Sequence, residues 1–181
     1  MKKQKKFRGM MTLLLALMMV FACTTTTLAA ELNNIAQDGR EYLIVNGTDI
    51  VYVGEDYQNP ETGEYIYWKN NARGVDKEFS FKVRWSVTSS NFTVSSEKVR
   101  VTADASVVDY ADVPQSGYKG HLYTVTISGV YSRDLQFDIG GIETGTINNL
   151  VKGGTYRVTI TNNDFLEDGR FLYGDGKIEG I

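Results

Sequence analysis

The stretch FSFKVRWSV, residues 79–87, places an apolar side chain at every second position. The alternating apolar residues are Phe79, Phe81, Val83, Trp85 and Val87. Successive side chains of a β-strand point to opposite faces, so this pattern predicts a strand with one buried face and one hydrated face. Trp85 shares its parity with the phenylalanines, and we therefore expect it in the core.

Shorter stretches of the same kind follow this one along the chain, at 92–94, 99–103, 123–127, 135–139, 144–147, 156–160 and 170–173. They are separated by segments rich in Gly, Asn, Asp and Ser, and helical periodicity is nearly absent after residue 30. Seven or eight short strands at a spacing of roughly ten residues are typical of a sandwich. The sequence thus predicts an all-β, antiparallel β-sandwich.

The first thirty residues are expected to be a signal peptide. Five basic residues precede an apolar run at 10–22, which is too short to span a bilayer as a helix. Small residues predict cleavage after Ala29 or Ala30 and hence a secreted, extracellular protein. An alternative is that the segment ending in Cys23 is a lipoprotein processing site, which would leave the protein anchored to a membrane through Cys23.

Loss of residues 1–30 would change the charge and the chemistry of the chain. The full chain has 19 basic and 22 acidic residues and a net charge of −3, and the signal contains five basic and no acidic residues, so the net charge becomes −8. Such a surface repels nucleic acid and anionic lipid, so we expect no nucleic-acid partner, and no membrane contact unless Cys23 is lipidated. Cys23 is the only cysteine, so the remaining chain has no disulfide.

Residues 31–181 are of a suitable length for a single β-sandwich domain. Within it, 31–76 is expected to supply N-terminal strands and a hairpin across Asn46-Gly47, and 77–181 the sandwich core. About 45 residues without disulfides rarely fold alone. We therefore expect the N-terminal strands to join the same sandwich.

The stretch GEYIYWKN, residues 63–70, has aromatic residues on both faces of a predicted strand. We expect Ile66 and Trp68 to face the core and Tyr65 and Tyr67 to lie on the outer face, where a phenol tolerates water. Tyrosine suits both sugar rings and protein partners, because it combines a flat apolar ring with a polar tip. Tyr57, Tyr65 and Tyr67 are therefore the candidate ligand-binding residues.

Catalytic groups are difficult to assemble from this chain. His121 is the sole histidine, and there is no Gly-x-Ser-x-Gly motif. We expect His121 at a strand edge or in a loop, and the lone Gly174-Asp175-Gly176 in a bulge or a tight turn. We therefore expect no enzyme, although a pair of carboxylates acting on a glycoside is a third hypothesis for function.

The segment NNDFLEDGR, residues 162–170, gathers four residues with oxygen ligands, Asn163, Asp164, Glu167 and Asp168. Oxygen ligands on a loop suit Ca²⁺ outside the cell. The spacing does not match a regular calcium loop, and Asp-Gly is also an ordinary turn signal. Ordinary turn chemistry is therefore the competing interpretation, and no other cofactor is expected.

The segment LVKGGTYRVTITN, residues 150–162, resembles the tyrosine corner of fibronectin type III and related immunoglobulin-like sandwiches. The resemblance covers about 123–178 and implies strands at 121–129, 134–139, 143–148, 155–162 and 170–178, with the Tyr156 phenol bonded to upstream backbone. Lys152-Gly153-Gly154 departs from the proline often found there, and a half-buried strand tyrosine is the alternative. As a whole, the chain resembles small exported proteins of Gram-positive bacteria in YIYWKN, FSFKVRWSVTSSNF and YRVTITNND, which implies export and a β-sandwich and nothing about chemistry.

Three classes of function are compatible with these features. The first is a secreted, non-catalytic binding module that recognises a glycan or a protein at or near the cell surface. The second is a structural protein that self-associates through an exposed strand edge. The third is the small carboxylate-dependent hydrolase.

Overall fold

The computed structural model describes residues 34–35, 41–45, 49–52, 56–59, 61–69 and 76–181. The predicted signal peptide and Cys23 lie outside these ranges. Within them, all helical or strand structure is β-strand and the strand pairs are antiparallel, which confirms the predicted fold class. The described part of the chain contains no apolar helix of membrane-spanning length.

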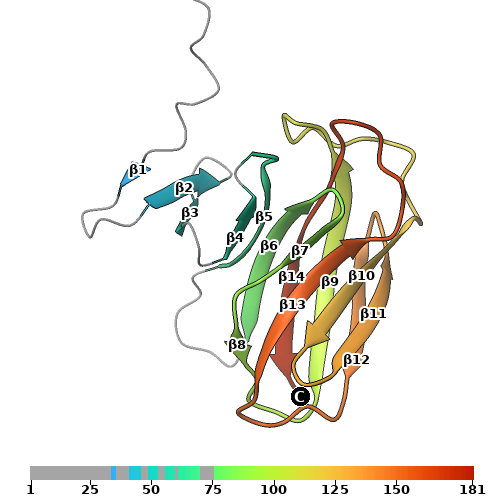
Figure 1. The fold of residues 1–181 in the computed structure, drawn as a ribbon. Helices are drawn as coiled ribbons and strands as arrows, with labels where there is room; N and C mark the ends of the chain where they lie inside the picture. The colour runs from blue at the N-terminus through green and yellow to red at the C-terminus, as the bar shows by residue number, and fades with distance from the viewer. Residues whose placement is uncertain (1–33, 36–40, 46–48, 53–55, 60, 70–75) are drawn as a thin grey trace, which may run out of the picture.

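The sandwich consists of two facing sheets (Figure 1). The first sheet has the order β11-β10-β13-β7, and β8 also pairs with β13. Its strands are β7 (Ser86–Thr88), β8 (Phe92–Thr93), β10 (Leu122–Ser128), β11 (Ser132–Asp138) and β13 (Thr155–Asn162). The second sheet has the order β12-β9-β14-β6-β5-β4. Its strands are β4 (Tyr57–Asn59), β5 (Glu64–Trp68), β6 (Lys77–Val83), β9 (Val99–Val108), β12 (Ile142–Ile147) and β14 (Phe171–Gly180).

The N-terminal strands divide between two sheets. β4 and β5 extend the six-stranded sheet, as predicted, whereas β1 (Asn34–Ile35), β2 (Glu41–Val45) and β3 (Asp49–Tyr52) form a separate three-stranded sheet. The expectation that all these strands join the sandwich is therefore wrong for β1 to β3. The predicted hairpin is confirmed, because β2 and β3 pair with Val45 opposite Asp49. Whether residues 31–181 behave as a single domain stays a prediction.

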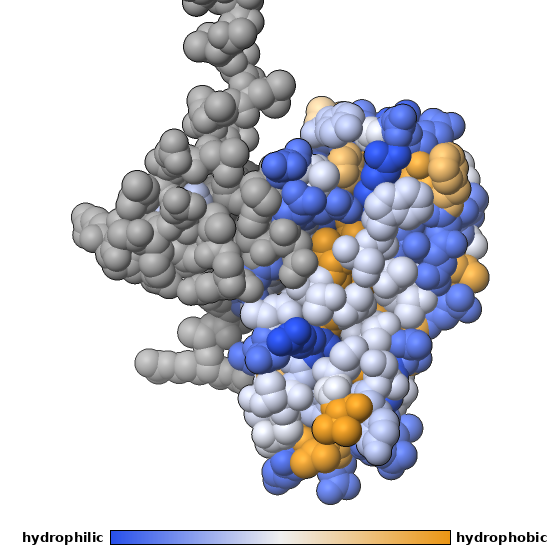
Figure 2. Space-filling view, in the orientation of Figure 1, coloured by the Kyte–Doolittle hydropathy of each residue, from blue (hydrophilic) through white to orange (hydrophobic). Residues whose placement is uncertain are grey.

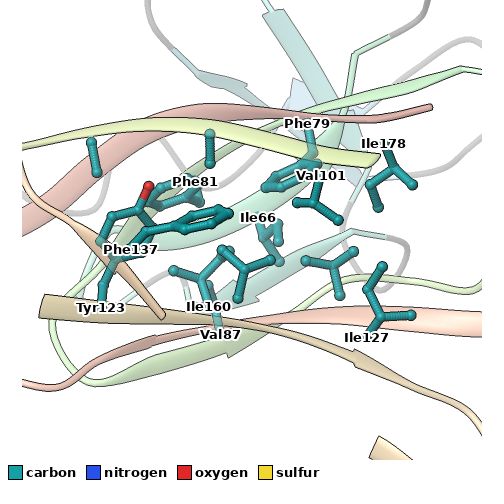
Figure 3. Close-up of a cluster of buried hydrophobic side chains, with 14 of the residues drawn as sticks. Ile66, Phe79, Phe81, Val87, Val101, Tyr123, Ile127, Phe137, Ile160 and Ile178 are labelled. Carbon is teal, nitrogen blue, oxygen red and sulfur yellow. The ribbon is translucent and has the colours of Figure 1, made fainter. Parts of the chain in front are cut away.

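The core lies between the two sheets and follows the alternation of the sequence (Figure 3). In β9, every second residue from Val99 to Val107 is buried, and Tyr123, Val125 and Ile127 do the same in β10. Figure 3 shows Phe79, Phe81 and Ile66 on the six-stranded sheet packing toward Ile160 and Val87 on the other sheet.

Gly174 and Gly176 lie in the middle of β14 rather than in a bulge or a turn, so that prediction is wrong. Gly176 pairs with Phe79, and a Cβ built on Gly176 would lie 2.2 Å from Phe79 Cζ. A Cβ on Gly174 would lie 2.8 Å from Phe81 Cζ. The two glycines therefore make room for the two phenylalanine rings, which lie over β14 inside the core.

Trp85 is 55% exposed, so its predicted place in the core is also wrong. β6 ends at Val83 in the six-stranded sheet, the chain bends at Arg84 and Trp85, and β7 begins at Ser86 in the other sheet. The period of two continues on both sides of the bend, since Val83 and Val87 are both buried. The crossing between sheets places Trp85 at the end of the sandwich.

Candidate functional site

The surface expected at Tyr65 and Tyr67 is not available for binding. Ile66 lies in the core and Trp68 packs against it, as predicted, so Tyr65 and Tyr67 lie on the opposite face. Their exposed fractions are only 5% and 4%, and the ring centroids are 5.6 Å apart. The expectation that this face is exposed is wrong. Tyr57 pairs with Tyr65 in β4, and its side chain lies outside what the structure describes.

The polar residues of β6 opposite these tyrosines are buried as well. Lys82, the partner of Tyr65 in the sheet, places its Nζ 2.6 Å from Asp112 Oδ1 and 4.9 Å from the centroid of the Phe171 ring. Ser80, the partner of Tyr67, donates a hydrogen bond to Asp175. A buried ammonium group requires such an opposite charge. We therefore assign Lys82 a structural role.

The candidate calcium residues lie in the connection 163–170 between β13 and β14, and the side chains of Asn163, Asp164 and Asp168 each have a partner within the protein. Asp164 hydrogen-bonds the imidazole of His121, and Asp168 pairs with Arg84. Asn163 donates its amide to Thr124 Oγ1 at 2.6 Å. The Glu167 carbonyl accepts a hydrogen bond from Arg170 N at 3.1 Å, and Gly169 has a φ of +76°, as a turn requires.

The carboxylate oxygens of Asp164 and Asp168 already bind His121 and Arg84, so they do not form a preformed calcium site. No cluster of three or more His, Cys, Asp or Glu side chains with metal-binding geometry occurs among the described residues. The segment has the backbone features of a turn, and calcium binding by it stays a prediction. His121 lies immediately before β10 and is exposed, as expected of a loop histidine.

Three exposed aromatic side chains lie at this end of the sandwich. Trp85 follows β6, Tyr110 follows β9 and Phe165 lies in the connection 163–170, and their exposed fractions are 55%, 74% and 73%. We call Trp85, Tyr110 and Phe165 the aromatic end. In Figure 1 these connections lie at the top of the sandwich, opposite the C-terminus.

The connection 163–170 holds the aromatic end together. The Arg84 guanidinium pairs with Asp168 and lies 5.8 Å from the centre of the Trp85 ring. Tyr110 packs edge-on against Phe171 at 5.3 Å. The Tyr110 ring also covers Gly169, where a Cβ would lie 2.7 Å from Tyr110 Cε2. The backbones under Trp85 and Tyr110 are therefore both attached to the connection that carries Phe165.

The loop from Asp109 to Val113 is ordered by its own hydrogen bonds. Asp109 Oδ1 accepts from Ala111 N at 2.9 Å and from Val113 N at 3.0 Å, which fixes the turn that presents Tyr110. Around the aromatic end, the segments 109–112 and 163–170 contain five acidic residues and one basic residue. Lys82, Arg84 and Arg170 pair with three of these carboxylates, so the aromatic end has an excess of two acidic residues over these basic ones, and the Glu167 carboxylate can accept hydrogen bonds from hydroxyl groups.

A shallow depression lies on the outer face of the six-stranded sheet. It is a shallow groove of about 210 Å³ lined by Lys69, Glu78, Thr102, Asp104, Ile142, Asp175, Gly176 and Lys177. Both of its lysines are paired with carboxylates, since Lys69 Nζ lies 2.7 Å from Asp175 Oδ1 and Lys177 Nζ lies 2.6 Å from Glu179 Oε1. The hydrogen bond between Lys177 and Glu179 raises the pKa of the lysine and lowers the pKa of the glutamate. Its lining has no aromatic ring, so the aromatic end is the better candidate site.

Sequence reasoning missed all three residues of the aromatic end. Phe165 stands in NNDFLEDGR, among carboxylates that favour calcium, and Tyr110 stands in the turn-rich DYADVP. In both cases, the available signal was an aromatic residue inside a polar, turn-forming segment, where no core can accommodate it.

No protein-family model matches the chain. No curated protein sequence is similar to it either. Among solved structures, a ruminal GH26 endo-β-1,4-mannanase is 16% identical with a TM-score of 0.29, over 55% of this chain and 19% of the mannanase chain. TmCBM61, solved in complex with β-1,4-galactotriose, is 13% identical with a TM-score of 0.24, over 68% of this chain and 74% of its own. The structure of infectious bursal disease virus Gx strain is 11% identical with a TM-score of 0.29, over 77% and 37%. This chain spans about a fifth of the mannanase, and similarities at these TM-scores carry no functional argument.

Proposed function

We propose that the protein is an exported, non-catalytic binding module whose aromatic end recognises a neutral glycan. The observation that carries this proposal is the exposure of Trp85, Tyr110 and Phe165 on three connections that are attached to one another. Aromatic side chains are usually buried, and several exposed ones at one place indicate a binding surface.

The chemistry of the aromatic end favours a sugar. Flat rings stack on the apolar faces of pyranose rings, and the carboxylates of Glu167 and its neighbours can accept hydrogen bonds from hydroxyl groups. The acidic surroundings disfavour a polyanionic ligand. The glycan is therefore expected to be uncharged.

Binding rather than catalysis is proposed because the titratable groups here are engaged with each other. The Asp164 carboxylate bonds His121 and the Asp168 carboxylate pairs with Arg84, so each is engaged with a basic side chain rather than facing a second carboxylate across a cleft. Export through residues 1–30 is part of the proposal, as is its alternative, anchoring through Cys23.

The experiment measures binding of the purified protein to a panel of soluble and insoluble neutral polysaccharides. Trp85→Ala and Phe165→Ala are each expected to weaken binding about tenfold, because each removes one stacking ring. Trp85→Phe keeps a ring and should retain most of the affinity. Tyr131→Ala is the matched control, since Tyr131 is equally exposed but lies at the opposite end of the sandwich.

Two results would contradict the proposal. Binding that is unchanged in Trp85→Ala and Phe165→Ala but lost in Tyr131→Ala would place the site elsewhere. No binding to any polysaccharide, together with reversible self-association in sedimentation, would favour the structural protein that pairs through a strand edge.

A further inference from the structure

The end of the sandwich opposite the aromatic end is formed by two short connections. These are the turn at 129–131 between β10 and β11 and the connection 148–154 between β12 and β13. They carry Val130, Tyr131 and Val151, which are 91%, 73% and 67% exposed. Figure 2 shows hydrophobic residues gathered at this lower end, the end at which the chain terminates in Figure 1.

Tyr156 and Arg133 hold the two connections together. The Tyr156 phenol accepts a hydrogen bond from Val151 N at 2.7 Å, and its ring lies so close to Gly129 that a Cβ there would be 2.7 Å from Tyr156 Cε1. The Arg133 guanidinium donates to the carbonyls of Tyr131 at 3.3 Å and Asn149 at 2.5 Å. The three exposed side chains are therefore presented by one rigid unit.

The charge at this end is opposite to that of the protein as a whole. The segments 129–133 and 148–157 contain Arg133, Lys152 and Arg157 and no acidic residue, whereas the chain has a net charge of −3. Glu97 lies next to the connection 148–154, because its backbone carbonyl accepts a hydrogen bond from Leu150 N at 2.9 Å. The neighbouring Lys98 balances the charge of the Glu97 carboxylate. Net charge alone predicts repulsion from an anionic bilayer, but this end is locally basic.

We infer that this end, defined by Val130, Tyr131, Val151 and Lys152, docks onto the surface of an anionic lipid bilayer. Small apolar side chains on protruding turns enter the interface, tyrosine lies at headgroup depth, and lysine binds lipid phosphates. Charge complementarity selects this occupant. A basic and apolar tip on an otherwise acidic protein would also orient the aromatic end away from the membrane, toward a glycan.

The experiment is co-sedimentation of the purified protein with vesicles of phosphatidylcholine, with and without about one third phosphatidylglycerol. Binding is expected only with the anionic lipid and is expected to weaken as salt rises. Lys152→Glu and the double variant Val130→Ser/Val151→Ser are each expected to weaken binding tenfold or more. Lys119→Glu and Val113→Ser are the matched controls, because both positions are exposed and lie near the aromatic end.

Several outcomes would overturn the inference. One is vesicle binding that persists in both docking variants, which would assign it to the N-terminal segment or to Cys23. Another is equal loss in the control variants. A third is a monomer–dimer equilibrium in sedimentation that Val130→Ser/Val151→Ser abolishes, with no vesicle binding, which would make a second copy of the chain the occupant. Binding to soluble anionic polymers but not to vesicles would exclude the bilayer.

Discussion

The side chain of Tyr156 links the start of β13 to the connection that precedes it. It is buried where β13 begins, and its phenol accepts the hydrogen bond from Val151 N, as expected of a tyrosine corner. The bond spans Gly153 and Gly154, and Gly153 has a φ of +78°. Two glycines thus achieve the reversal without the proline that often stands in such corners.

Replacing Tyr156 by phenylalanine tests the corner directly. The Val151 amide loses its acceptor while the buried ring remains, so the free energy of unfolding is expected to fall by about 1 kcal/mol. Urea denaturation measures the change, and Tyr131→Phe, at an exposed tyrosine, is the control. A loss no larger than that of the control would show that the bond contributes nothing.

At Tyr123, removal of the hydroxyl is expected to have the opposite effect on stability. It is fully buried, and among the described residues its hydroxyl has no hydrogen-bond partner. Removing a buried and unsatisfied hydroxyl removes its desolvation penalty. Tyr123→Phe is therefore expected to leave the stability unchanged or to raise it by up to about 1 kcal/mol. A clear loss of stability in urea would mean that the hydroxyl is satisfied.

The same residue predicts a pH dependence. Burial, and to a lesser degree the charges of Asp104 and Glu143, raise the pKa of Tyr123 above its ordinary value of 10.0. The folded state then retains a proton that the unfolded state releases, so stability is lost as the pH rises above about 10. In urea titrations between pH 9 and pH 11.5, this loss is expected to be smaller in Tyr123→Phe. Parallel curves for the two proteins would contradict the assignment.

Among the elements, β14 illustrates how two faces of one strand serve different purposes. Its inward positions 174 and 176 are glycines beneath Phe81 and Phe79, whereas Asp175, Lys177 and Glu179 form the polar outer face. On the neighbouring strand β9, small residues stand opposite both glycines, since Ala103 pairs with Gly176 and Ala105 pairs with Gly174. The rings thus occupy volume that larger residues on β14 and β9 would fill.

Gly176→Ala is therefore expected to destabilise the protein by about 1–3 kcal/mol, because the new methyl group overlaps the Phe79 ring. Gly141→Ala is the control, since nothing lies within 4 Å of its Cβ position. The double variant Gly176→Ala/Phe79→Leu is expected to recover part of the loss, measured by thermal unfolding. Additive losses in the double variant would show that the ring is not the obstacle.

At the scale of the whole molecule, the sandwich has two unlike ends. The aromatic end is acidic, and the opposite end is basic with exposed valines. Between the two ends, one hydrophobic core fills the space between the sheets. β14 lies between β9 and β6 in the interior of the larger sheet. Stability should therefore be highest at the centre of the sheets and lowest at the edges and connections.

Hydrogen exchange tests this distribution. Amides of β9 and β14 are expected to exchange most slowly, because each of these strands is paired on both sides. Amides of the edge strands β11 and β4, and of the connections 109–121 and 163–170, are expected to exchange faster. Mass spectrometry of peptide fragments resolves these segments, and uniform protection across them would contradict a centre-to-edge gradient.

The sequence alone determined the sandwich, because alternation of apolar side chains is a local property of a strand. It located most strands of residues 77–181 within a few positions, such as the alternating stretch 156–160 inside β13, and it predicted the inward direction of Ile66 and Trp68. The tyrosine corner at Tyr156 was implied by the resemblance to fibronectin type III sandwiches, with a half-buried strand tyrosine as the alternative. The sequence also placed His121 in a loop. The strand positions and the directions of their side chains follow from neighbouring residues.

Only the tertiary structure decided which surfaces are open. Alternation assigns Tyr65 and Tyr67 to the face opposite the core, but it does not show that this face is buried. It assigns Trp85 the parity of the core, but it does not show that the chain crosses between the sheets there. Contacts between distant segments decide which side chains are exposed. They also decide the pairing of Asp164 with His121 and of Asp168 with Arg84, and they bring Trp85, Tyr110 and Phe165 to one end. Local patterns in a sequence do not contain such contacts.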